Sequence, residues 1–370
     1  MKNPEITILM TVYNAEQYLK QSISSIIGQT YQDFEFLIID DRSTDNSIQI
    51  VKSFKDDRIR LHCNDINLGQ TKSLNVGLHL ARGKYIARMD ADDFAYSRWL
   101  EKLIVVLEKN QDCVVVSANT VVVDENNRVK RFFRLPGEYK DIVLRSMTFS
   151  PINHVGSIMR KNVIIGLGGY DEQYSIAADY NLWVELIMRG KTLVSCDDNL
   201  VAIREHSKSL SRSGRYHEGI NELCRVMRKM CRFITGNAQI DGQVKLVCDL
   251  FFNEDRLDQG EFEMAMDALE NLYQSILPAF NMETDRVNRF LKNRAKTAVL
   301  KRINKFIEKK DSHIVKMTAK YGMDKFGAGS YFTMISLMSY LGPNALTLIP
   351  KFYLSILSIK SRMAINYFKK

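Results

Sequence analysis

Residues 83–93 read Gly83-Lys84-Tyr85-Ile86-Ala87-Arg88-Met89-Asp90-Ala91-Asp92-Asp93, a short β-type run that ends in three carboxylates within four positions. Carboxylates crowded at a strand end repel one another, and a divalent cation or hydrogen-bond donors would offset that repulsion. An Asp-x-Asp at the carboxyl end of a strand suits a site for a metal ion and a diphosphate. An isolated Asp-x-Asp is more often a solvated turn, so the rest of the chain decides the interpretation.

The segments that precede this stretch alternate between strand-like and helix-like patterns. Strands are expected at 6–12, 34–39, 58–63 and 85–89, with apolar residues at helical spacing between them. This alternation predicts an α/β fold with a Rossmann-like, mostly parallel central sheet flanked by helices. In such a sheet, ligands bind beyond the carboxyl ends of the strands, which is where Thr11, Asp41 and Asp92 fall.

The pattern changes after the triple-Asp stretch. A helix to about residue 110 is followed by two β-type runs, 114–123 and 129–135, which predict a hairpin. An amphipathic helix is expected over 177–188, and short strands near 192–205. From Tyr216 onward the spacing is entirely helical, so we expect a boundary near 211–214. The predicted parts are 1–212, a helical region over 213–325 and an apolar, basic helical tail over 326–370.

Charge is unevenly distributed along the chain of 370 residues, whose net charge is +9. From Arg286 onward there are 18 Lys and Arg but only 3 Asp and Glu. Within this region, residues 326–350 carry no charge, and Gly342-Pro343-Asn344 divides them into segments too short to span a bilayer. Apolar helices bordered by basic residues favour peripheral attachment to an anionic membrane surface. The alternative is a helical bundle that packs on the first part of the chain. No nucleic-acid-binding motif accompanies the charge.

Cysteine spacing and the amino terminus indicate the compartment. The six cysteines show no Cys-x-x-Cys pair and no zinc-like spacing, which is typical of reduced, buried thiols. Nothing at the start of the sequence has the pattern of a signal peptide. We therefore expect a cytoplasmic protein, peripheral on the inner face of the cell membrane if the tail binds lipid.

No Gly-x-Gly-x-x-Gly or Walker lysine loop follows the first strand, so dinucleotide and P-loop phosphate sites are excluded. Instead, seven segments over residues 4–210 resemble, in order, the family-2 glycosyltransferases. They are Thr-Val-Tyr-Asn at 11–14, Ile-Ile-Asp-Asp-Arg-Ser-Thr-Asp at 38–45, Asn-Leu-Gly at 67–69, residues 83–93, Asn-His-Val-Gly-Ser at 153–157, Ala-Asp-Tyr-Asn-Leu-Trp at 178–183 and Arg-Glu-His at 204–206.

The resemblance implies a GT-A fold and an inverting enzyme that uses nucleotide-diphosphate sugars. It places a nucleotide-binding half at about 1–95 and an acceptor half at about 96–212. Asp41 would accept from the uracil imide or its equivalent, whereas Asp45 is expected to be structural. The residues expected at the nucleotide are Thr11, Tyr13, Asp41, Asn67, Gly69, Arg88, Asp90 and Asp92.

A cofactor, Mn²⁺ or Mg²⁺, is also implied by the resemblance. Both cations prefer oxygen ligands and complete their shells with diphosphate oxygens and water. Asp92 is the first choice as ligand, with Asp93 and His206 as further candidates. The division of work among Asp90, Asp92 and Asp93 is left open by the sequence.

Asp179 matches the general base of the family, which takes a proton from the acceptor hydroxyl. Many relatives have Glu immediately before this Asp, whereas this chain has Ala178, which puts one acceptor contact in doubt. Asp179 would also be favoured by the dipole at the start of a helix. His154 is expected at the donor or acceptor pocket, with a buried structural histidine as the alternative. Trp183 is expected at the same pocket, with core packing behind Asp179 as the alternative.

These observations predict a metal-dependent inverting glycosyltransferase of hexosyl or N-acetylhexosaminyl type. The expected donor is a UDP-sugar, and the expected acceptor is a glycan or lipid-linked glycan in cell-surface polysaccharide assembly. The rival hypothesis is a noncatalytic sugar-nucleotide-binding or scaffold protein with the same fold. The presence of Asp179 beside a complete set of three aspartates favours the enzyme.

Overall fold

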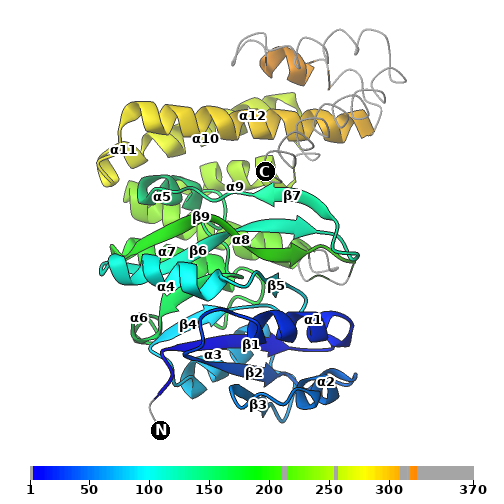
Figure 1. Ribbon diagram of the computed structural model, residues 1–370. Helices are drawn as coiled ribbons and strands as arrows, with labels where there is room; N and C mark the ends of the chain where they lie inside the picture. The colour runs from blue at the N-terminus through cyan, green and yellow to red at the C-terminus, as the bar shows by residue number, and fades with distance from the viewer. Residues whose placement is uncertain are drawn as a thin grey trace, which may run out of the picture. The chain divides into compact units, whose positions relative to one another are not determined.

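Strands β1 (Ile6–Val12), β2 (Phe34–Asp40), β3 (Ile59–Cys63) and β4 (Tyr85–Arg88) form the parallel half of a nine-stranded sheet in the computed structural model. The structure describes residues 3–207, 209, 216–253, 257–308, 315 and 317–322. The order β3-β2-β1-β4 runs upward from the base of Figure 1. Every residue of β1 and β2 is buried, as expected for strands covered on both faces.

Helices cover both faces of this parallel half. Helices α1 (Glu16–Ile27), α2 (Ser47–Ser53) and α4 (Trp99–Lys109) share one apolar core with Ile8 and Met10 of β1. Helix α3 (Gln70–Leu80) packs on the opposite face, where a Cβ at Gly77 would overlap the side chain of Leu9. The doubly wound arrangement predicted from the alternating pattern is therefore confirmed.

The second half of the sheet is mixed and longer than the sequence pattern indicated. β6 (Cys113–Val123) and β7 (Val129–Phe133) form the predicted hairpin, and β8 (Ser157–Arg160) lies antiparallel between β4 and β6. In place of short strands near 192–205 there is one strand, β9 (Thr192–Arg204), parallel to β6 with two irregularities in register around Asn119. The short β5 (Phe94–Ala95) closes the far edge against β9.

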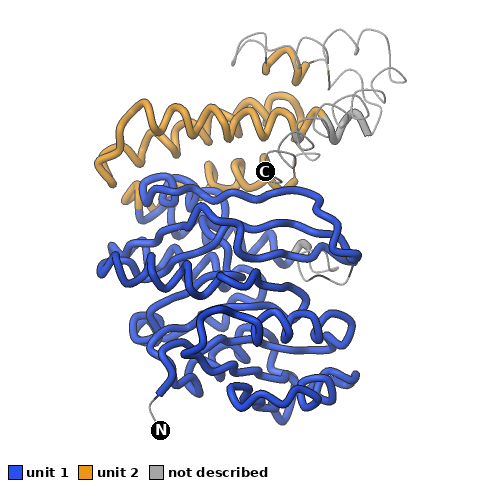
Figure 2. Tube along the Cα trace, viewed as in Figure 1, with its two compact units in different colours: residues 1–233 blue, residues 234–370 orange. Residues whose placement is uncertain are grey.

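Further helices complete the first of two compact units, which runs to Phe233 (Figure 2). They are α5 (Tyr139–Ser146), α6 (Lys161–Gly166), α7 (Ala178–Met188) and α8 (Tyr216–Thr235), the last of which extends two residues into the second unit. The unit boundary thus lies after α8 begins, later in the chain than the boundary expected near 211–214.

The second unit begins at Ile234, and its described part is helical. It contains a 3₁₀ turn (Ala238–Ile240), α9 (Asp241–Phe252), α10 (Gln259–Gln274), α11 (Ile276–Ala279) and α12 (Thr284–Glu308). Asp258 and Glu261 form a capping box that fixes the start of α10. The predicted tail at 326–370 lies outside the described residues. Within the part that the structure describes, no helix combines the length and the hydropathy needed to span a bilayer.

Candidate active site

The loops that follow β1 and β2 are locked together at the carboxyl edge of the sheet. Asp45 accepts hydrogen bonds from the backbone N–H of Glu16 and of Ser47, both at 3.0 Å. The Glu16 carboxylate in turn accepts from the backbone N–H of Asn46 at 3.0 Å. Asp45 thus satisfies an N–H group at the start of α1, and Glu16 satisfies one at the start of α2. This geometry supports the structural role expected of Asp45.

Asp41, at the end of β2, is buried and already holds the loop that precedes α3. One carboxylate oxygen accepts from Asn64 Nδ2 at 2.9 Å and from the N–H of Leu68 at 2.8 Å, while the other accepts from the N–H of Gly69 at 2.8 Å. Asn67 donates to the backbone carbonyl of Asp41 at 3.0 Å. A carboxylate offers about four acceptor positions. One position therefore remains for a nucleobase, and the base-reading role of Asp41 stays a prediction.

Three of the residues expected at the nucleotide differ in how exposed they are. Thr11 is buried at the end of β1, while Tyr13, two residues later, is 54% exposed. Gly69 adopts a φ of +83°, a conformation that favours glycine, and it begins α3 with open space around it. These positions form the rim of the edge where the nucleotide is expected.

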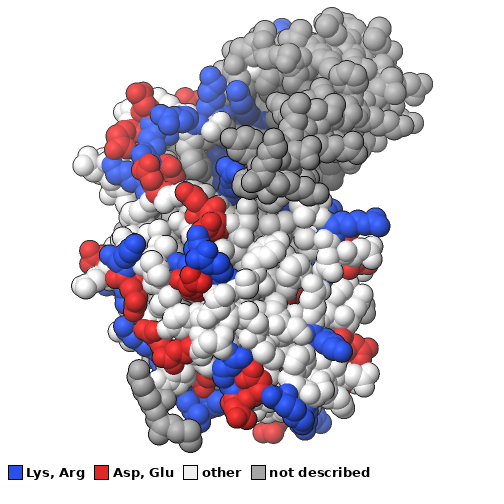
Figure 3. Space-filling view, viewed as in Figure 1, with Lys and Arg blue, Asp and Glu red and all other residues white. Residues whose placement is uncertain are grey.

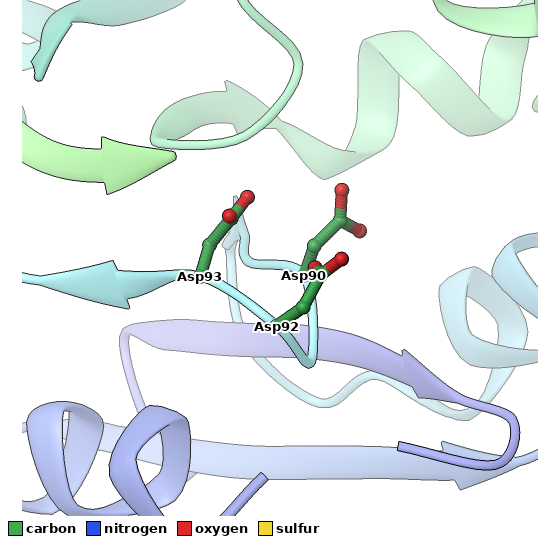
Figure 4. Close-up of side chains that lie close together, drawn as sticks. All are labelled: Asp90, Asp92 and Asp93. Carbon is green, nitrogen blue, oxygen red and sulfur yellow. The ribbon is translucent and has the colours of Figure 1, made fainter. Parts of the chain in front are cut away.

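The three aspartates after β4 point to the same side of the loop that leads to β5 (Figure 4). A carboxylate oxygen from each lies within 4.8 Å of the other two. Asp90 is paired with Arg88, whose buried guanidinium also donates to the carbonyl of Leu9. Asp92 Oδ2 lies 2.9 Å from Nε2 of His206. Of the metal ligands predicted from the sequence, Asp92 lies beside both Asp93 and His206, and their role as ligands stays a prediction.

Asp93 differs from the other two aspartates. It is 3% exposed, and its Oδ1 accepts from the backbone N–H of Arg204 at 2.7 Å. The side chains of Asp90 and Asp92 are 27% and 32% exposed, so they are the two that can reach a ligand from solvent. Asp93 therefore holds the end of β9 beside the cluster through Oδ1, and its role as a metal ligand stays a prediction.

The electrostatics of the cluster fit a bound cation. Burial raises the pKa of Asp93 well above its usual value, and the charges of Asp92 and Asp90 raise it further. Burial also raises the pKa of Asp90, although Arg88 opposes that shift. A divalent cation among these oxygens would favour their ionised forms and remove the repulsion. An all-oxygen set with one nearby imidazole suits Mg²⁺ or Mn²⁺.

Asp179, the residue that matches the family's general base, lies in the first turn of α7. Its side chain retains partial access to solvent, and its Oδ2 lies 3.5 Å from the Ser150 hydroxyl. Burial raises the pKa of Asp179 to about 6, and the negative charge of Asp90 contributes to the shift. The shift suits a carboxylate that accepts a proton, and the role of Asp179 at the acceptor hydroxyl stays a prediction.

His154 lies beside this region but is held by neighbouring side chains. Its Nε2 is 2.8 Å from the hydroxyl of Tyr170, and its ring meets Trp183 edge-on with centroids 6.1 Å apart. Burial and the charge of Arg88 lower the pKa of His154 well below its usual value, so the ring is neutral. Trp183 is fully buried and its ring contacts His154, which fits the core-packing interpretation; a place in the donor or acceptor pocket stays a prediction.

Sequence reasoning missed several residues that hold the aspartates of the site in place. Arg204 had no assigned role, yet its N–H binds Asp93 and its Nε donates to the Asp92 carbonyl at 2.9 Å. Its guanidinium also lies over the Tyr18 ring. Asn64 and Ser150 were likewise absent from the prediction. Arg204 stood within the quoted Arg-Glu-His segment, which was the one available signal.

The chain was compared with known proteins. Residues 7–166 match the profile described as Glycosyl transferase family 2. An uncharacterized glycosyltransferase of Haemophilus influenzae is 33% identical over 256 residues, covering 65% of this chain and 77% of the relative. The UDP-Glc:α-D-GlcNAc-diphosphoundecaprenol β-1,3-glucosyltransferase WfgD of Escherichia coli is 29% identical over 54% of this chain and 72% of its own length.

Solved structures show the same fold. Residues 1–349 of TarS of S. aureus, in a complex with UDP-GlcNAc, align with a TM-score of 0.55 and 18% identity, covering 86% of this chain and 92% of that chain. The order of motifs, the mixed sheet with its three aspartates and the identity with the H. influenzae relative lead to one conclusion: the chain belongs to glycosyltransferase family 2.

Proposed function

We propose that the protein transfers a hexosyl or N-acetylhexosaminyl residue from a UDP-sugar to a hydroxyl of a lipid-linked glycan, with inversion at the anomeric carbon. The single observation that carries this proposal is the convergence of the Asp90, Asp92 and Asp93 carboxylates at the end of β4 in a chain that belongs to family 2. A general base and a diphosphate site are the two parts that such a transfer needs within one site.

The chain's own residues support the donor end of this reaction. Asp92, with Asp93 and His206 beside it, would hold Mn²⁺ or Mg²⁺, and Asp90 completes the acidic cluster. When bound, that cation would stabilise negative charge on the departing nucleoside diphosphate. Asp41 and the loop at Asn67 and Gly69 would surround the base, and Thr11, Tyr13 and Arg88 would border the nucleotide.

The acceptor end depends on Asp179. The ionised carboxylate takes the proton as the acceptor oxygen forms its bond to the anomeric carbon. The bond from that carbon to the diphosphate breaks on the opposite face, which inverts the configuration. A pKa near 6 keeps Asp179 ionised at neutral pH while making it a stronger base than an exposed aspartate.

The choice of substrates rests on the relatives. WfgD is named for a UDP-glucose donor and a GlcNAc-diphosphoundecaprenol acceptor, and TarS was solved with UDP-GlcNAc. A relative in Erwinia amylovora is named an amylovoran biosynthesis glycosyltransferase. We extend these names to a role in cell-surface polysaccharide assembly at the cytoplasmic face of the membrane, with the basic tail as the lipid-facing part.

The test is the release of UDP from a panel that includes UDP-glucose and UDP-GlcNAc, with a synthetic GlcNAc-diphospholipid as acceptor. We expect turnover with Mn²⁺ or Mg²⁺ that EDTA abolishes, and a product whose anomeric configuration by NMR is opposite to that of the donor. Nucleotide binding without turnover across the panel would favour the noncatalytic rival. A retained configuration would contradict the inverting mechanism.

A further inference from the structure

A buried carboxylate from α8 meets the loop that leads into α7. Glu222 is 4% exposed, and its Oε1 accepts from both the N–H and the hydroxyl of Ser175, each at 2.9 Å. Its Oε2 accepts from the N–H of Ile176 and of Ala177, each at 2.8 Å. Four hydrogen bonds from three consecutive residues thus converge on one side chain. The next residues along the chain, Ala178 and Asp179, begin α7.

These contacts fix the loop that leads into α7, a helix that has no side-chain cap at Ala177. Ala177 precedes α7, and no side chain at that position can accept from the first turn. Burial alone would raise the pKa of Glu222, but the N–H donors of Ser175, Ala177 and Ile176 and the Ser175 hydroxyl hold it below its usual value. Glu222 is therefore ionised at neutral pH, and charge-assisted hydrogen bonds of this kind are the stronger ones.

Helix α8 contacts the polypeptide on both sides of Asp179. Before it, Arg225 donates to the carbonyl of Gln173 at 3.1 Å. After it, Lys229 donates to Oδ1 of Asn181 at 3.0 Å and pairs with Glu185. The turn that carries Asp179 is thus held from one helix at points before and after the carboxylate.

A glycine one turn before Glu222 allows this close approach. A Cβ built at Gly219 would lie 3.2 Å and 3.3 Å from side-chain carbons of Ile176, closer than ordinary van der Waals contact. Gly219 and Glu222 lie three residues apart, so they share a face of α8. Helix α8 therefore meets residues 175–177 through close packing at Gly219 as well as through the hydrogen bonds of Glu222.

We propose that Glu222 is a positioning residue for catalysis: by binding the backbone of Ser175, Ile176 and Ala177, it sets the place and direction of Asp179 at the acceptor hydroxyl. This inference rests on the proposed function, in which Asp179 is the base. Glu222 touches neither substrate nor nucleotide in this scheme. Because a displacement of about 1 Å can cost about 10²-fold in rate, a loosened turn would reduce transfer without affecting donor binding.

The first experiment replaces Glu222 by Gln in the full chain. The amide nitrogen cannot accept a hydrogen bond, so two of the four donors lose their partner. We expect kcat for UDP release, with the donors and diphospholipid acceptor above, to fall about 10–100-fold, while the Kd for UDP with Mn²⁺ stays within twofold. Amide hydrogen exchange should accelerate in a peptide covering 173–183 and stay unchanged in the strands of the parallel half.

Two further variants make the result specific. Glu218→Gln removes an exposed carboxylate one turn earlier on α8 and should leave kcat, UDP binding and exchange as in the wild type. Gly219→Ala keeps the Glu222 carboxylate but pushes on Ile176, so it should lower kcat and accelerate exchange in the same peptide. It decides the question if Glu222→Gln does not fold.

Either of two outcomes overturns the proposal. One is wild-type kcat and wild-type exchange over 173–183 in Glu222→Gln. The other is a loss of UDP binding together with faster exchange throughout the first unit, which would make Glu222 a general stabilising residue. If the wild type releases no UDP from any donor, the proposed function fails by itself, and the exchange data still decide whether Glu222 holds the turn.

Discussion

Asp179 carries the most direct pH prediction at the scale of single residues. Burial raises its pKa to about 6, and only the ionised form can accept a proton. The transfer rate should therefore be full above pH 7 and should fall about tenfold for each unit of pH below 6. A pH profile of kcat between 4.5 and 8 measures this. A flat profile down to pH 5 would show that another group accepts the proton.

Replacing this base should affect the chemical step alone. Asp179→Asn keeps the size of the side chain but loses the basic oxygen, so kcat should fall about 10²–10⁴-fold. The Kd for UDP measured by calorimetry should change little, because Asp179 is not among the residues expected at the nucleotide. Wild-type transfer by this variant would remove Asp179 from the mechanism.

Substitution should show which of the three aspartates binds the metal ion. The Asp92 side chain is partly exposed and pairs with His206, so Asp92→Asn should weaken Mn²⁺-dependent UDP binding by at least tenfold and leave the fold intact. Asp57→Asn changes an exposed carboxylate between α2 and β3, outside the aspartate cluster, and serves as the control. Calorimetry that shows equal Mn²⁺-dependent binding in both variants would contradict the assignment of Asp92 as a metal ligand.

Residue types could be predicted from the sequence where the chemistry is local. The cluster at 90–93 was visible because three carboxylates in four positions need an explanation. The roles of Asp93 and Arg204 were not visible, because the bond between them joins positions 111 residues apart. The same holds for Glu222, which meets the loop before Asp179 from a helix more than forty residues later.

At the scale of elements, the loop between β3 and α3 depends on Asp41. Its carboxylate accepts three hydrogen bonds from Asn64, Leu68 and Gly69, and it is buried. In Asp41→Asn, an amide nitrogen would face at least one of these donors, which should cost about 1–3 kcal/mol of stability. We expect a lower melting temperature and weaker UDP binding. Asp65→Asn, at an exposed position of the same loop, should change neither.

The parallel half was predictable because each strand there has a continuous buried pattern and a helix on either side. The mixed half was less so. β8 has only four residues and lies antiparallel between two longer strands, so its sequence carries little periodicity. β9 was expected as short strands because its register against β6 shifts around Asn119, and such irregularities interrupt the alternation of inward and outward residues.

At the scale of the whole molecule, the two ends of the chain differ in their balance of charge. On the visible face of the first unit, acidic and basic side chains are interspersed (Figure 3). In contrast, α12 alone contains eight Lys or Arg and two acidic residues, and further basic residues flank the uncharged stretch 326–350. A near-neutral catalytic part joined to a basic end suits an enzyme whose acceptor is embedded in an anionic membrane.

The final prediction concerns this basic end. Juxtamembrane Lys and Arg contribute about 1 kcal/mol each near an anionic surface, a contribution that salt screens, whereas inserted apolar segments are less sensitive to salt. The full chain should therefore float with vesicles that contain phosphatidylglycerol at low salt and should be released only partly at about 1 M NaCl. It should float only weakly with neutral phosphatidylcholine vesicles, which offer the apolar contribution alone. A chain that ends at Lys325 should bind the anionic vesicles more weakly while keeping its affinity for UDP and Mn²⁺. If the full chain stays in the soluble fraction at low salt, the apolar stretch is better explained as part of a helical bundle.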